Sequence, residues 1–312
     1  MHSRSVALSA VLLSALAGLL WTTVGAQQGA GDAARLLAGT IDIHVHNLPD
    51  DRPRSIDAID VAKLAAQRKM RAIVLKNHFE STAGPVYLVR QVVPGIEVFG
   101  GIALNRSVGG INIEAVRRMV AVQGGYGRVV WLPTYDNDTP AKRADGTPFV
   151  AVSKDGALLP EVIELLDFMG QNPRLTLETG HVSPPEGLMV VRAAKARGVT
   201  HLVITHAMVL GWTVALMQEA AREGAYIEFV YLGALNGRLT FKDYADAIRQ
   251  VGPEHVILAT DLGGVPPNTN YPLEAQGFQL YLEEMHKLGF SLAELDLMAK
   301  TNPALALGLE PK

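Results

Sequence analysis

Short apolar runs alternate with amphipathic stretches along most of the chain. Runs of strand length occupy residues 40–46, 71–78, 97–104, 127–133, 174–180, 201–206, 225–231 and 256–261. Stretches with apolar positions at helical spacing occupy residues 55–69, 82–93, 112–123, 158–171, 185–197, 213–223, 240–251 and 274–288. Regular alternation of this kind predicts parallel strands buried on both faces, and eight repeats predict an α/β fold of the (β/α)8 TIM-barrel type.

A doubly wound sheet is the alternative fold for alternating strands and helices. It requires a glycine-rich phosphate-binding turn after the first strand. The turn in this chain is instead His46-Asn-Leu-Pro49. We therefore predict a single barrel domain over residues 39–309.

The first 26 residues have the organisation of an export signal. A short basic start that contains Arg4 precedes an apolar core from Val6 to Trp21, and small residues follow up to Ala26. The core is shorter than the roughly 20 residues that a membrane span needs. We expect cleavage near Ala26, a loose leader over residues 27–38, and a periplasmic or secreted mature protein without a membrane span.

Charge and composition narrow the class of partner. The chain has 28 Lys and Arg against 31 Asp and Glu, and loss of Arg4 with the signal changes the net charge from −3 to −4. The absence of a basic run argues against nucleic-acid binding. Because there is no cysteine, neither disulfides nor a lipid-modified cysteine can form. We expect a small-molecule substrate, and the sequence leaves the formation of homo-oligomers open.

Residues that can bind a divalent cation stand at the ends of four predicted strands. Alternation in the first strand places Asp42, His44 and His46 on one face, opposite Ile41, Ile43 and Val45. The other three strand ends carry His181, His206 and Asp261. Active sites of barrels lie at the C-terminal ends of the strands, so these side chains are expected to converge on one mouth.

Side-chain parity supports most of this convergence. His206 is expected to share a face with Leu202 and Ile204, and Asp261 to share one with Ile257 and Ala259, as fillers of the barrel. In the fifth strand, Glu178 and His181 fall on opposite parities, so either can point inward. We favour His181, because Gly180 allows the backbone to twist and neutral imidazole is a common metal ligand.

These strand ends, together with the tail Asn302-Pro-Ala-Leu-Ala-Leu-Gly-Leu309, resemble the amidohydrolase superfamily of metal-dependent hydrolases over about residues 39–309. The resemblance implies that His44, His46 and Asp261 bind a metal, usually zinc, and that His181 binds the same metal or a second one. It also implies that Asp261 handles the proton of the attacking water.

The chain departs from this family at the fourth strand. Family members with two metals carry a bridging carboxylated lysine or glutamate there, whereas this strand offers Trp131. Two residues that could substitute for the bridge are Lys76, which shares a face with His78, and Glu228. We favour an ion pair of Lys76 with Glu228 or Asp42 over a carboxylated bridge, and contact with a substrate carboxylate or oxyanion is its other functional role.

The simplest site holds one divalent cation. Its expected ligands are His44, His46, His181 and Asp261, with Zn²⁺ favoured and Mn²⁺ or Fe²⁺ as alternatives. Such a cation lowers the pKa of its water from about 15.7 towards 7. Asp261 and His206 are the expected catalytic groups, and the additional candidates are Lys76, His78, Glu178 and Glu228.

This pattern is similar to the mononuclear branch of the superfamily, which includes deaminases and, in related architecture, a group of decarboxylases. We expect a metal-dependent hydrolase that acts on an amide, ester or lactone of a small molecule. The alternatives are a non-oxidative decarboxylase of a small carboxylate and an exported binding protein without turnover.

Other polar residues are assigned supporting roles. His201, His255 and His286 are expected at the surface or in packing, and Asp42 is expected one layer below the metal ligands. The long insertion at residues 134–157 and the segment Pro266-Pro-Asn-Thr-Asn270 are candidate walls of the site, because long loops at a barrel mouth are usually functional.

Overall fold

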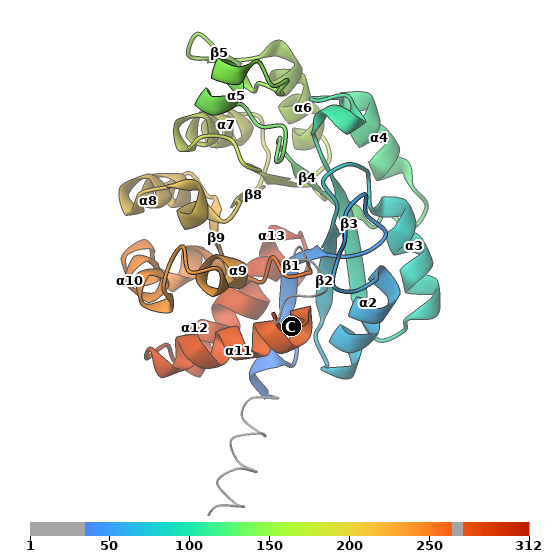
Figure 1. Cartoon of the computed structure of the whole chain (residues 1–312), viewed down its shortest axis with the longest axis vertical. Coiled ribbons are helices and arrows are strands. Elements are labelled where there is room, and N and C mark those ends of the chain that lie inside the picture. The colour runs from blue at the N-terminus through green and yellow to red at the C-terminus, as the bar shows by residue number, and fades with distance from the viewer. Residues whose placement is uncertain (1–34, 264–270, 312) are drawn as a thin grey trace, which may run out of the picture.

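Parallel strands curl into a barrel that is surrounded by helices, as the computed structural model shows for residues 35–263 and 271–311 (Figure 1). The eight-stranded sheet has the order β1-β2-β3-β4-β7-β8-β9-β10. Its strands are β1 (Ile41–His46), β2 (Ala72–Lys76), β3 (Glu97–Ala103), β4 (Gly127–Trp131), β7 (Thr176–Glu178), β8 (His201–Ile204), β9 (Tyr226–Val230) and β10 (Val256–Ala259). The predicted (β/α)8 fold is confirmed.

The barrel closes where the first strand meets the segment after the last. Val45 forms a parallel bridge with Leu262. The backbone N–H of His46 donates to the Leu262 carbonyl at 2.9 Å, and that of Asp261 donates to the His44 carbonyl at 2.9 Å. Hydrogen bonds therefore join the first strand, which carries His44 and His46, to the segment after the last strand, which carries Asp261.

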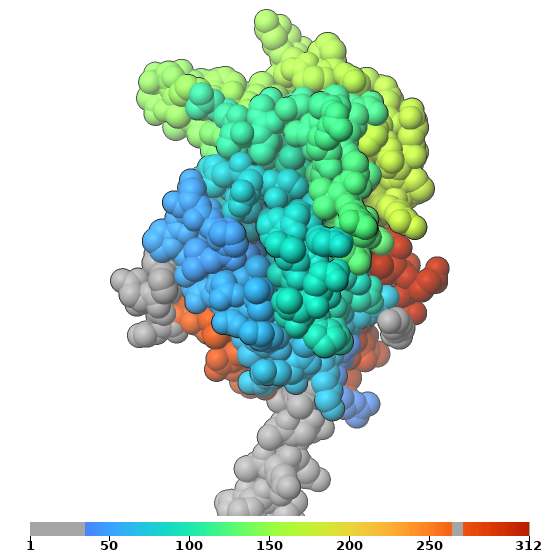
Figure 2. Space-filling view, turned by 90° about the vertical axis from the view of Figure 1, so that its right-hand side faces the viewer, coloured from blue at the N-terminus to red at the C-terminus, as the bar shows by residue number. Residues whose placement is uncertain are grey.

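Each barrel strand is followed by a helix close to its predicted range. These helices are α2 (Ala58–Gln67), α3 (Ala83–Val92), α4 (Ile113–Ala121), α6 (Pro160–Gly170), α7 (Pro184–Ala196), α8 (Val214–Arg222), α10 (Phe241–Val251) and α11 (Glu274–Lys287). Capping residues fix several starts, because Asp57 and Thr240 accept from the first free N–H groups of α2 and α10, and Glu186 accepts from the backbone N–H of Ser183 at the start of α7. Helices α2, α3 and α4 together cover the face of the barrel seen in Figure 2.

Shorter elements decorate this frame. The insertion after β4 forms α5 (Pro140–Asp145) and a hairpin of β5 (Ser153–Lys154) with β6 (Ala157–Leu158), and α9 (Tyr231–Leu235) follows β9 directly. Single turns of 3-10 helix occur at η1 (Arg106–Val108), η2 (Ala207–Leu210) and η3 (Pro253–His255). The chain ends in α12 (Leu292–Asp296), the π-helical turn η4 (Leu297–Thr301) and α13 (Asn302–Ala306).

The tail plugs one end of the barrel. Ala304, Ala306 and Leu307 pack into the interior cluster that contains Ile41 and Ile257. The side-chain amide of Asn302 donates to the carbonyls of Pro253 and Val256 at 2.9 and 2.7 Å, at the start of β10. Because the tail closes the N-terminal ends of the strands, the open end is the one where the predicted site residues lie.

The prediction that Asp42 shares a strand face with His44 and His46 is wrong. Ile41 and Ile43 point into the barrel interior, and Asp42 lies on the outer side beside Glu274 of α11. The register of β1 against β2 shifts between Asp42 and Val45, so that His44 nevertheless reaches the mouth. An irregularity of this kind reverses the facing of a strand without any signal in its apolar pattern.

A similar correction applies to the sixth barrel strand. Leu202 and Ile204 pack outward against the helices, and Val203 fills the interior. His206 reaches the mouth through a positive φ of 25° rather than by alternation. The eighth strand behaves as predicted, because Ile257 and Ala259 fill the interior.

Some predicted segments fall outside the described residues. These are the export signal, residues 27–34 of the leader and the wall at Pro266–Asn270. At the end of the leader, Leu36 and Leu37 are buried in the outer core, so these two residues pack with the barrel. Within the described ranges, no helix combines the length and apolar character needed to cross a membrane.

Candidate metal centre

A cavity of about 240 Å³ opens at the C-terminal end of the barrel strands. Its walls include most of the polar residues that the sequence identified, namely His44, His46, Lys76, His78, His181, His206 and Asp261. Glu178 and Glu228 do not line the cavity, and both are completely buried beneath it.

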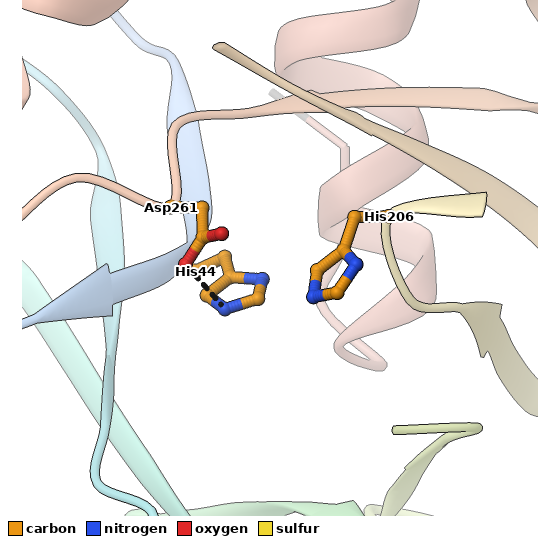
Figure 3. A group of neighbouring side chains, drawn as sticks. All are labelled: His44, His206 and Asp261. Carbon is orange, nitrogen blue, oxygen red and sulfur yellow. Dashed lines mark ion pairs between the residues drawn. The ribbon is translucent and has the colours of Figure 1, made fainter. Parts of the chain in front are cut away.

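Asp261 is the point at which the two histidines of the first strand meet. Its Oδ1 atom lies 3.1 Å from His44 Nε2 and 3.2 Å from His46 Nε2. The imidazole of His206 lies opposite the side chains of His44 and Asp261 (Figure 3), with its ring centre 5.6 Å from that of His44. Donor atoms of His44, His206 and Asp261 all lie within 4.8 Å of one another.

Asp42 holds the aspartate in place from behind. Its Oδ2 accepts from Thr260 Oγ1 at 2.6 Å, and its Oδ1 accepts from the backbone N–H of Thr260 at 3.1 Å. Asp42 therefore connects β1 to Thr260, the residue before Asp261. The backbone of Asp261 itself is left-handed, with a φ of 56°. Burial raises the pKa of Asp42 to about 6. Asp42 therefore supports the site from the outer side of β1, through Thr260, rather than from the layer below the metal ligands inside the barrel.

Glu228 orients two of the histidines from below. Its Oε1 lies 3.1 Å from His44 Nδ1, and its Oε2 accepts from the backbone N–H of His206 at 2.7 Å. The contact with Nδ1 leaves His44 Nε2 directed at Asp261, as a carboxylate behind a ligating histidine would. Glu178 Oε2 accepts from Thr205 Oγ1 at 3.0 Å, and burial, with Glu228 nearby, raises the pKa of Glu178 to about 8.

The turn after β7 brings His181 to the cavity. Gly180 has a φ of 58°, and a Cβ atom there would lie 2.1 Å from the Leu132 carbonyl oxygen, so this turn requires glycine. The backbone N–H of His181 donates to the Pro133 carbonyl at 2.9 Å. His181 and Glu178 thus occupy different levels, with the histidine in the cavity wall and the glutamate below it.

Burial keeps most of these imidazoles neutral. It lowers the pKa of His46 to about 3 and that of His206 to about 4, and it lowers the pKa values of His78 and His181 well below the usual range. For His44, burial and Lys76 lower the pKa, but Asp261 and Glu228 outweigh them and raise it to about 10. Neutral imidazole is the ligand form, whereas the position of His44 between two carboxylates favours a cation, either a proton or a metal ion.

Lys76 occupies the floor of the cavity. Its Nζ atom lies 3.0 Å from His44 Nε2 and 5.2 Å from the centre of the Trp131 ring. The predicted ion pair with Glu228 or Asp42 does not form as a direct contact, since the amine is turned towards His44. Trp131 is the last residue of β4, and no acidic residue or lysine occurs in this strand.

The donor set fits a divalent cation. Imidazole nitrogens with one carboxylate oxygen are typical ligands of catalytic zinc. His181 Nε2, His46 Nδ1 and His206 Nδ1 are buried and have no hydrogen-bond partner among the described residues. Buried polar atoms are nearly always satisfied, so these nitrogens call for a further partner, either a water or a ligand. His46 Nδ1 is the ring nitrogen opposite the one that faces Asp261, so its partner lies away from that carboxylate. A second group, formed by His44, Glu178 and Glu228, lies deeper and is completely buried.

Several residues of the cavity were not identified from the sequence. They are Arg54 in the loop after β1, and Asn236 and Arg238 after α9. Tyr135, which also lines the cavity, belongs to the insertion at residues 134–157 that was expected to form a wall. Loops that follow barrel strands form the mouth, which is the one signal that could have indicated them. His255 and His286 lie elsewhere, on η3 and on the outer helix α11, as expected.

Solved enzyme structures share this fold. Organophosphorus hydrolase from Deinococcus radiodurans matches 88% of this chain and 94% of its own, with a TM-score of 0.57 and 15% identity. N-acetyl-D-glucosamine-6-phosphate deacetylase from Mycobacterium smegmatis matches 88% and 77%, with a TM-score of 0.54 and 17% identity. 2,6-Dihydroxybenzoate decarboxylase from Rhizobium matches 87% and 99%, with a TM-score of 0.55 and 10% identity.

The fold predicted from the resemblance to the amidohydrolase superfamily is thus confirmed, since these similar structures belong to that superfamily. Among curated proteins, none matches this chain. A protein-family model, described as a family of unknown function, matches residues 39–228, which include β1 to β9 as far as Glu228. The chain therefore belongs to the family DUF6282.

Proposed function

We propose that the chain is a metal-dependent hydrolase that cleaves an amide, ester or lactone bond of a small molecule. The observation that carries this proposal is the convergence of donor atoms from His44, His206 and Asp261 within 4.8 Å at the open end of the barrel. The fold shared with two hydrolases supports it.

One divalent cation, with Zn²⁺ favoured, fits this site. The proposed ligands are His44, His46, His181 and Asp261. Of these, His44 and Asp261 belong to the group of donor atoms within 4.8 Å, whose third member is His206. A bound cation of this kind lowers the pKa of a water and polarises a carbonyl group. Lys76 and Trp131 occupy the side on which a second cation would need its bridging anion, which supports a single metal.

Asp261 is the proposed base. Its carboxylate is the only one in the described lining of the cavity, and its backbone is fixed by the bond to His44. In this role the carboxylate takes a proton from the attacking water and passes it to the leaving group. Neutral His206, on the opposite wall, donates a hydrogen bond to the developing oxyanion.

A decarboxylase is the second candidate. The similarity in fold to 2,6-dihydroxybenzoate decarboxylase favours it, as does the lack of an anionic residue at the end of β4. The two reactions share the same proposed ligands and differ in their products.

Metal removal and product analysis test these functions together. We expect a panel of esters, amides, lactones and small carboxylates to reveal a turnover that a chelator abolishes and Zn²⁺ or Mn²⁺ restores. Release of CO₂ would replace the hydrolase by the decarboxylase. Turnover that persists in the chelated, metal-free protein would contradict both functions.

We also propose that the chain works in the periplasm after removal of its first 26 residues. The export signal in the sequence supports this location. Sequencing of the mature N-terminus should give a start near Gln27, and an intact Met1 on protein recovered from cells would contradict it.

A further inference from the structure

The lining of the cavity carries more positive than negative side chains. Arg54, Lys76 and Arg238 face it, whereas Asp261 is the one carboxylate in the described lining. Below the floor, Glu228 contacts the imidazole of His44 and accepts from the backbone N–H of His206, and Glu178 accepts from Thr205. A bound divalent cation would add to this positive charge.

Arg54 is held rigidly at the edge of the cavity. It is only 2% exposed, and its Nε and Nη2 atoms both lie 2.6 Å from Asp50 Oδ2. Asp50 itself does not line the cavity. Because the ion pair fixes the guanidinium before any ligand arrives, little side-chain entropy remains to be lost on binding.

Arg238 differs from Arg54 because it is exposed. It follows the short helix α9, and its backbone N–H donates to Asn236 Oδ1 at 3.2 Å. Its guanidinium forms no ion pair with any residue in the described ranges. This side chain is therefore available to an anion that enters the cavity.

We propose that the substrate carries an anionic oxygen group, a carboxylate or a phosphate, which Arg54 and Arg238 bind while the bond to be cleaved faces Asp261 and His206. This inference rests on the proposed function and names its substrate class. Arginine suits the role because its planar guanidinium donates two parallel hydrogen bonds to such groups. The cavity volume of about 240 Å³ restricts the ligand to a small molecule or one small end of a larger one.

Three matched hydroxamates test the inference without knowledge of the substrate. Each has the same metal-binding hydroxamate and a two-carbon spacer, and they end in a carboxylate, a phosphonate or a neutral carboxamide. With the zinc-loaded mature protein, calorimetry should show that one of the anionic compounds binds about 10- to 100-fold more tightly than the carboxamide. The anion that binds more tightly identifies the source of the charge.

Variants locate the effect. Arg238→Gln should lower the preference for the anion by about tenfold and leave the affinity for the carboxamide unchanged. Arg54→Lys should also lower the preference for the anion, because lysine keeps the charge of Arg54 and loses its planar geometry. The control is Arg118→Gln, since Arg118 lies on α4 with 81% of its side chain exposed and pairs with Glu114.

The outcomes separate this inference from the proposed function. Equal binding of all three compounds to the zinc-loaded protein would overturn the inference and leave the proposed function intact. A preference for the anion that survives both arginine variants would also overturn it. Protein that takes up no metal and binds none of the compounds would overturn the proposed function, and the inference with it.

Discussion

Asp261→Asn is expected to lower turnover by about two to four orders of magnitude, the range for loss of a positioned proton-transfer group. The substitution keeps the shape of the side chain and an oxygen near His44 Nε2 and His46 Nε2, but it removes the base. The turn is fixed by the hydrogen bond from the backbone N–H of Asp261 to the His44 carbonyl, and an asparagine side chain leaves this bond intact. Most of the metal should therefore remain bound.

The measurement is kcat together with metal content, on the best substrate of the panel. Asp167→Asn is the matched control, because this exposed aspartate lies on α6 and pairs with Arg197 far from the cavity. Near-parental turnover of Asp261→Asn would show that the proposed role of Asp261 is wrong. His206, which lines the cavity, would then be the first candidate for the base, ahead of the Glu178 that lies buried below it.

His44→Ala is expected to abolish both metal binding and activity. The substitution removes the imidazole that lies between Asp261 and Glu228, and it leaves Glu228 and Lys76 buried without this partner. Breaking one side of a buried charged network typically costs about 3–5 kcal/mol, so the variant should also unfold at lower temperature.

His46→Ala separates metal loss from instability. The Nδ1 atom of His46 has no partner among the described residues, so its removal breaks fewer bonds than loss of His44. We expect this variant to fold, to lose its metal and to be inactive. His255→Ala and His286→Ala should keep the metal and the activity, because these residues lie on η3 and α11. Parental metal content in both the His44 and His46 variants would place the site elsewhere.

The barrel could be predicted from the sequence because its signal is repeated along the chain. Each apolar run of strand length is followed by a helical pattern, and the capping residues mark where several helices begin. The facing of individual residues was less predictable. A register shift in β1 and the left-handed backbone of His206 reverse the simple alternation, and both depend on contacts between distant strands.

The histidines and Asp261 could be placed together because the ends of barrel strands meet. The partner of Lys76 could not be predicted, since the choice between His44 and Glu228 depends on differences in position of a few ångströms. Arg54 and Arg238 lie in loops without periodicity, and nothing in their spacing resembles a motif. The positive lining of the cavity therefore became apparent only in three dimensions.

The metal content of the purified mature protein, measured by elemental analysis and located by anomalous scattering, tests the central claim most directly. We predict about one divalent cation per chain, beside His44 and Asp261. Absence of a metal after growth and purification with Zn²⁺ would contradict the claim of a metal centre. Two occupied positions about 3.5–4 Å apart would contradict the single-metal site and make Lys76 or Glu228 the bridge.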